Sequence, residues 1–172
     1  EASALLQGLT DHADVCSLVM VGDGPLLSVV QERAHQLGLE HLVQFPGVLS
    51  PDAVVQEMRR ARVFVQHSRT AEDGDEEGCP VSVMEAQLCG LPVVATRHGG
   101  IPDVVVDQQT GTLVEEGDRR GMAEAMALLA DRPELAAAWG AAGQRRSQGR
   151  FTVKHHVDQI TMLLNDLVDH RR

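Results

Sequence analysis

Residues 77–85, with the sequence EGCPVSVME, decide how the chain folds around them because they join a loop to a helix. Pro80 suits the first turn of a helix, where its missing N–H leaves no hydrogen bond unmade. Helical spacing predicts a buried stripe made of Val81, Met84, Glu85 and Leu88. Glu77 is then expected in the loop that leads into the helix.

The start of this helix lies between two carboxylates. Backbone N–H groups at a helix N-terminus have no intrahelical partner and favour anions. A carboxylate on the buried stripe, as predicted for Glu85, needs a partner because an unpaired buried charge is costly. Together, Glu77, the helix start and Glu85 suit a ligand with hydroxyls at both ends and phosphate between them. A nucleotide sugar has this layout.

Short β-rich runs alternate with helices along the chain. Strands are expected at residues 17–21, 42–45, 63–66, 92–95 and 112–114. Helices are expected at residues 2–9, 25–37, 51–60, 80–89, 118–130, 133–148 and 152–169. The alternation predicts an α/β fold with a parallel, doubly wound sheet. In the last helix, a packing stripe is expected from Val153, Val157, Ile160, Leu164 and Leu167.

The composition excludes several classes of function. With 172 residues, 43% of them apolar, the chain suits one soluble globular domain. A net charge of -10 argues against a nucleic-acid partner, which requires clustered Lys and Arg. The three cysteines lack metal-type spacing and are expected as reduced thiols in a cytoplasmic protein. No apolar run approaches the roughly 20 residues of a membrane span.

Four further segments accompany the two acids in a fixed order: VGDGP at 21–25, VQFPG at 43–47, GLPVVAT at 90–96 and GGIP at 99–102. With them, residues 67–86 resemble the Glu-x7-Glu region of retaining GT-B glycosyltransferases, in particular glycosyltransferase family 4 (group 1). The resemblance implies a Rossmann-like C-terminal domain of a GT-B fold, with helices on both faces of the sheet. Residues 1–172 would form a single nucleotide-sugar-binding domain, truncated at its N-terminal side. The first strand and the N-terminal acceptor domain would be missing, so this chain alone is expected to be inactive.

The resemblance also implies roles for individual residues. Glu77 would be the catalytic residue and contact the donor sugar, while Glu85 would accept the ribose hydroxyls. The other implied donor-binding residues are Gly78, Cys79, Val81 and Ser82 through their N–H groups, Gly22, Gly24 and Pro25 in a turn, Gly47 and Val48 at the base, and His67. Two alternative interpretations stay open. The turn could be a tight strand-to-helix turn that binds no ligand, and His67 could be a rim histidine whose hydrogen bonds are satisfied within the protein. The nearby cations are Arg69, Arg97 and His98.

The implied reaction moves a sugar from a UDP- or GDP-linked donor to a glycan, lipid or small-molecule acceptor with retention. No metal and no cofactor are expected, and the full-length enzyme would lie in the cytoplasm or at the inner face of the membrane. The acidic loop at residues 72–78 fails as an EF-hand because Met84 stands at the twelfth position, where a bidentate Glu is required. Leu27 replaces the third glycine of a dinucleotide fingerprint. The alternatives are a GT-B-fold nucleotide-sugar epimerase and a non-catalytic nucleotide- or partner-binding domain.

Overall fold

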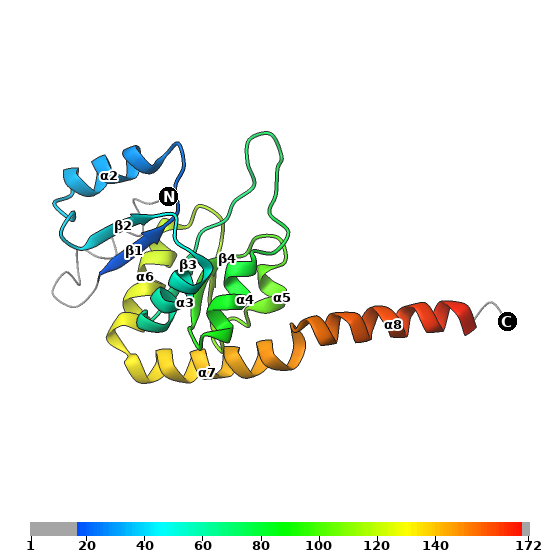
Figure 1. The fold of residues 1–172 in the computed structure, drawn as a ribbon. Coiled ribbons are helices and arrows are strands. Elements are labelled where there is room, and N and C mark those ends of the chain that lie inside the picture. Colours follow the sequence, from blue (N-terminus) through cyan, green and yellow to red (C-terminus); the bar gives the residue numbers. More distant parts are fainter. Residues whose placement is uncertain (1–16, 170–172) are drawn as a thin grey trace.

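The computed structural model describes residues 17–169 of the chain, so the helix expected at residues 2–9 lies outside the described residues. Its strands are β1 (Leu18–Val21), β2 (Val43–Gly47), β3 (Phe64–Gln66), β4 (Val93–Thr96) and β5 (Gly111–Val114). All the pairings between these strands are parallel. The strands are divided between two sheets, β1-β2 and β3-β4-β5 (Figure 1). Sequence periodicity located the strands but not this division.

The helices that follow these strands are α2 (Leu27–Gln36), α3 (Pro51–Arg60), α4 (Val81–Leu88), α5 (Ile101–Val104), α6 (Arg119–Asp131), α7 (Pro133–Arg150) and α8 (Val153–Asp169). Side-chain caps fix two of their starts. Ser50 Oγ accepts a hydrogen bond from Ala53 N at 3.3 Å, and Asp118 Oδ1 accepts one from Gly121 N at 2.8 Å. The short helix α5 was not predicted, because four residues are too few to show a helical period.

Helices cover both faces of the β3-β4-β5 sheet. Val93 and Ala95 of β4 belong to one buried cluster with residues of α3, α4 and α5, whereas Val94 between them packs with α6 and α7. Successive side chains of a strand point to opposite faces, so this alternation places one helical layer on each side. The predicted fold class, an α/β Rossmann-like doubly wound arrangement, is confirmed.

The predicted buried stripe of α4 is wrong for three of its four residues, whereas Met84 is half-buried and packs against the core. Val81 is 62% exposed, Leu88 is 40% exposed and Glu85 is also exposed. The buried face instead carries Val83, Ala86 and Gln87. Gln87 turns inward because its amide is paired there: its Nε2 donates to Thr110 Oγ1 at 3.1 Å, and its Oε1 accepts from Ser147 Oγ at 2.8 Å. A satisfied polar side chain thus sets the helical phase.

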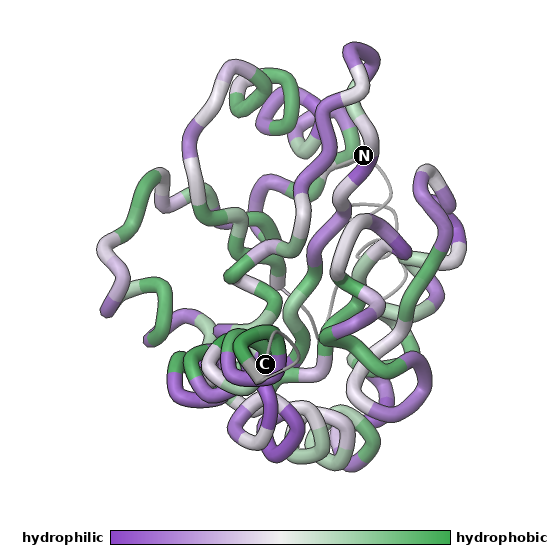
Figure 2. The backbone as a smooth tube through the Cα atoms, turned by 90° about the vertical axis from the view of Figure 1, so that its right-hand side faces the viewer, coloured by the Kyte–Doolittle hydropathy of each residue, from purple (hydrophilic) through white to green (hydrophobic). Residues whose placement is uncertain are grey.

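The apolar stripe of α8 does not act as packing surface within the described residues. Val153, Val157, Ile160, Leu164 and Leu167 are between 44% and 81% exposed. Figure 1 shows α8 extending away from the rest of the protein, and Figure 2, which views it nearly end-on, shows hydrophobic and hydrophilic residues around it.

The start of α4 differs slightly from the prediction. Pro80 is the N-cap of α4, so the helix begins at Val81, one residue later than expected.

Candidate functional site

The carboxyl ends of β3 and β4 are tied together by one threonine. Thr96 Oγ1 accepts a hydrogen bond from Ser68 N at 2.9 Å and donates one to Ser68 O at 2.7 Å. Both residues are buried, and Ser68 Oγ accepts from Gln66 Nε2 at 3.3 Å. This junction sits where ligands bind in open α/β sheets, outside the carboxyl ends of the strands.

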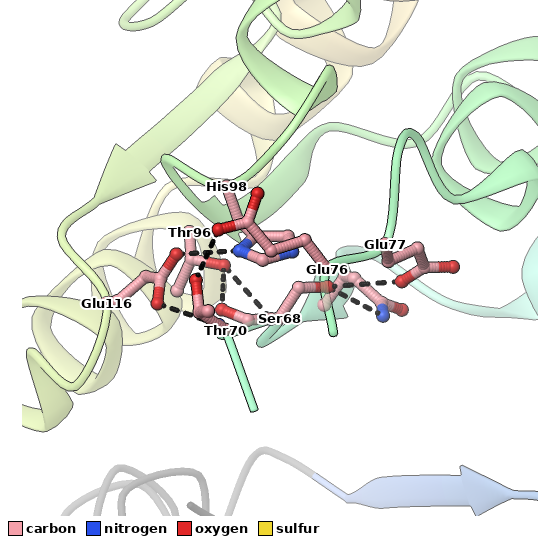
Figure 3. Close-up of polar contacts among 8 residues, drawn as sticks. Ser68, Thr70, Glu76, Glu77, Thr96, His98 and Glu116 are labelled. Carbon is pink, nitrogen blue, oxygen red and sulfur yellow. Dashed lines mark hydrogen bonds and ion pairs between the residues drawn. The ribbon is translucent and has the colours of Figure 1, made fainter. Parts of the chain in front are cut away.

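Glu77 reaches back to this junction from the loop before α4. Its Oε2 accepts a hydrogen bond from Ser68 Oγ at 3.4 Å, and the residue is exposed (Figure 3). The backbone N–H groups of Gly78, Cys79, Val81 and Ser82 donate to no described residue. These N–H groups lie at the positive end of the α4 dipole, so the geometry can accept an anion beside an exposed carboxylate.

Glu85 lies one turn into α4. The residue is exposed, and its carboxylate makes no hydrogen bond or ion pair with another described residue. Val81, four residues earlier, shares the same face of the helix. The structure therefore places Glu77 in the loop and Glu85 on the helix, as predicted, but it leaves Glu85 open to solvent instead of buried.

The predicted turn residues form a second group, at the carboxyl ends of β1 and β2. Gly22 N donates to Gly47 O at 2.9 Å, which joins the two turns. Gly22 has φ of 129° and Gly47 has φ of 73°, values that L side chains rarely adopt. Gly24 N donates a hydrogen bond to Asp23 Oδ1 at 2.8 Å. Val48, after the second turn, is 78% exposed, and Pro25 is exposed as well.

A cluster that sequence reasoning missed centres on Glu116, which follows β5. Glu116 Oε1 lies 2.6 Å from Nδ1 of the buried His98, and Oε2 accepts from Thr70 N at 3.0 Å (Figure 3). Thr70 Oγ1 in turn donates to Glu76 Oε1 at 3.0 Å. The hydrogen bond with His98, and then that with Thr70 N, hold the pKa of Glu116 below its usual value. The cluster links the loop carrying Glu77 to the ends of β4 and β5.

Two of the three cations expected near the site, Arg97 and His98, are paired with carboxylates. Arg97 Nη2 lies 2.6 Å from Asp107 Oδ2, and Arg97 Nε lies 3.4 Å from Glu115 Oε1. His98 is paired with Glu116. Neither side chain is therefore directed to a phosphate at the start of α4. Sequence reasoning missed these pairs because the partners lie 10 to 18 residues away along the chain.

Both ring nitrogens of His67 are buried and have no hydrogen-bond partner among the described residues. The same holds for Nε2 of His98. A satisfied rim histidine is therefore the wrong description of His67. Buried ring nitrogens without partners are uncommon in folded proteins, so His67 stays a candidate for contact with a ligand.

Cys79 lies between the two acids, and burial is the main cause that raises the pKa of its thiol, with smaller contributions from the charges of Asp103 and Glu77. A raised pKa disfavours the thiolate and so disfavours a nucleophilic role. Within residues 17–169, no group of three or more His, Cys, Asp or Glu side chains is placed to hold a metal ion. No helix in the same range is long and apolar enough to span a membrane.

The sequence model of the family described as glycosyl transferases group 1 matches residues 2–146. Over 130 residues, the chain is 40% identical to the GDP-mannose-dependent alpha-(1-6)-phosphatidylinositol monomannoside mannosyltransferase of Mycolicibacterium smegmatis, covering 74% of this chain and 34% of that protein. Over 110 residues it is 34% identical to the amylovoran biosynthesis glycosyltransferase AmsK of Erwinia amylovora, covering 64% and 27%. The chain thus spans about a third of the length of the curated relatives it matches.

A solved structure with the same architecture is that of Anabaena HepE in complex with UDP and glucose. It superposes on this chain with a TM-score of 0.78 at 26% identity, covering 95% of this chain and 44% of HepE. The likeness thus extends over nearly all of this chain.

Proposed function

Because the chain belongs to the group 1 glycosyl transferases, we propose that it is the donor-binding domain of a retaining, family 4 enzyme that transfers a sugar from a UDP- or GDP-linked donor. The observation that carries this proposal is the arrangement at the start of α4. Four backbone N–H groups without described partners lie there between the exposed carboxylates of Glu77 and Glu85. The mannosyltransferase relative is named as GDP-mannose-dependent and HepE was crystallised with UDP, which is consistent with a nucleotide-sugar donor.

Each part of the site suits one part of the donor. The N–H groups of Val81 and Ser82 would meet the diphosphate, since they carry the positive end of the helix dipole without a formal charge. Glu77 would accept hydroxyls of the sugar, and Glu85 would accept the two ribose hydroxyls in a bidentate manner. The turns at Gly22–Pro25 and Gly47–Val48 would approach the nucleoside.

In the transfer, the bond between the anomeric carbon and the phosphate oxygen breaks and a bond to the acceptor oxygen forms on the same face. The hydroxyl proton of the acceptor passes to the phosphate oxygen of the leaving nucleoside diphosphate, which departs with the bonding electron pair. Helix N–H groups aimed at the leaving phosphate stabilise the negative charge that develops on it. Arg97 and His98 are paired with carboxylates, so cations other than these two would meet the diphosphate. The reaction is proposed to need no metal ion.

The proposal is tested by titrating UDP, GDP and their sugar derivatives into the chain, and into the longest natural protein that contains it, by calorimetry. We expect saturable binding of one nucleotide series. Glu85→Ala should weaken the binding of the nucleoside diphosphate, by about tenfold or more, since a charge-assisted hydrogen bond contributes about 1.5–3 kcal/mol. Glu77→Ala should affect the sugar derivative alone. Glu72→Ala, which removes an exposed acid from the same loop, is the matched control.

Saturable binding that follows this order supports the donor-site assignment. If neither form of the protein binds any nucleotide, the donor site does not exist and a partner-binding domain is the better description. If Glu77→Ala weakens UDP or GDP more than Glu85→Ala does, the two roles are reversed. Free epimerised sugar nucleotide formed without an acceptor would instead identify an epimerase.

A further inference from the structure

The turn between β4 and α5 contacts the backbone of the loop that carries Glu77. Gly100 N donates a hydrogen bond to Gly78 O. A Cβ atom added to Gly99 would overlap the carbonyl oxygens of both Glu77 and Gly78. The backbones of the two segments are thus in contact, and only a residue without a side chain fits at position 99.

The turn is the fixed side of this contact. Ile101 is completely buried, and its N–H donates to His98 O at 3.0 Å. The His98 ring is 2% exposed and its Nδ1 lies 2.6 Å from Glu116. Residues 71–78, by contrast, are all exposed. Gly99 itself is exposed, but the turn is anchored on both sides by the buried His98 and Ile101. A clash between the two segments would therefore be relieved by movement of the exposed loop, because packed interior side chains have little space in which to shift.

We propose that Gly99 is a positioning residue that sets where the Glu77 carboxylate and the Gly78 N–H stand relative to α4. The inference rests on the proposed function, in which Glu77 contacts the donor sugar. Gly99 touches no donor atom in this role. It acts through the backbone of residues 77 and 78, which its missing side chain allows to approach the end of β4.

Two properties require glycine at this position, and they can be separated. Gly99 has φ of 48°, which is strained for any L side chain, and it also lies against backbone oxygens. Gly117 has φ of 79° with no atom within 4 Å of an added Cβ, so it shares the strain without the contact. Gly100 has contacts of intermediate closeness, since its added Cβ would lie 3.0 Å from Gly78 O and 3.1 Å from Cys79 Cβ.

The experiment compares Gly99→Ala with Gly117→Ala by calorimetric titration of the nucleoside diphosphate and of its sugar derivative. In the parent protein, the ratio of the two affinities measures the contribution of the sugar contacts. Gly99→Ala should reduce that ratio by about tenfold or more, since a misplacement of about 1 Å costs up to about a hundredfold in such sites. Its affinity for the nucleoside diphosphate should stay within about twofold, because Glu85 and the N–H groups of Val81 and Ser82, which would meet that part of the donor, belong to α4 and not to the displaced loop. Gly117→Ala should leave both affinities unchanged.

A second readout needs no ligand. The amide resonances of residues 77–79 should shift in Gly99→Ala and not in Gly117→Ala. If Gly99→Ala does not fold, Gly100→Ala replaces it and should show a smaller loss of the same ratio. An unchanged ratio together with unchanged resonances would overturn the inference. A parent protein that binds no nucleotide would refute the donor site alone, and the resonances would still decide whether position 99 fixes the loop.

Discussion

Replacing Gln87 with Leu tests whether a buried amide sets the orientation of α4 and, through it, of the site. Gln87 is fully buried and joins α4 to α7 and to the turn before β5, with bonds to Ser147 at 2.8 Å and to Thr110 at 3.1 Å. Leu keeps most of the side-chain volume but removes both bonds. Thr110 Oγ1 retains its contacts with Val106 N at 2.9 Å and Val106 O at 3.4 Å, so only Ser147 is left without a partner in the network.

The expected cost follows from these contacts. Each lost hydrogen bond contributes about 0.5–1.5 kcal/mol, and a hydroxyl left buried without a partner adds to the loss, so Gln87→Leu should lower the free energy of unfolding by roughly 2–3 kcal/mol. Ser147→Ala should lower the free energy of unfolding by about 1–2 kcal/mol, because it leaves Gln87 Oε1 buried without a hydrogen-bond donor. The double variant should cost about 1 kcal/mol less than the sum, since it removes both partners of one bond.

Urea denaturation followed by circular dichroism measures all three variants, and Gln56→Leu on the exposed face of α3 is the control. The control should stay within about 0.5 kcal/mol of the parent protein. If Gln87→Leu is as mild as Gln56→Leu, or if the single costs add within about 0.5 kcal/mol, then the network does not hold α4 and the reasoning fails.

Two further changes test the contacts around the site. Glu116→Gln should lower the denaturation midpoint near pH 7. Because the pKa of Glu116 is lowered in the folded state, its contribution is present above its ordinary pKa of 4.5 and is lost as the pH falls through the folded value, so the difference should shrink in acid. A difference that grows on acidification would contradict the bond to His98. Gly140→Ala should destabilise by about 1–3 kcal/mol, since its Cβ would overlap Gly90 O, whereas Gly149→Ala in the same helix, with open space around it, should be neutral or stabilising.

Local signals predicted most of the elements. Strand positions such as Val93–Thr96 follow from short apolar runs, and helix starts such as that of α3 follow from Ser50 and Pro51, so their bounds agree with the sequence to within a few residues. Pairing is a non-local property. The division of the strands into two sheets, and the pair of His98 with a carboxylate 18 residues away, leave no periodic trace in the sequence.

One wrong prediction bears on function: it concerns which face of α4 is buried. Hydrophobicity favoured burial of Val81 and Leu88. Gln87 is buried in their place because its amide nitrogen and its amide oxygen both have hydrogen-bond partners in the interior. The helix is thereby rotated so that Glu85 faces solvent. The sequence argument that Glu85 needs a ligand to relieve a buried charge no longer applies. What replaces it is accessibility: an exposed acid with no described partner is free to meet a ligand, and its removal leaves no buried group unsatisfied. Glu85→Ala therefore separates binding from folding, which it could not do if Glu85 lay in the core.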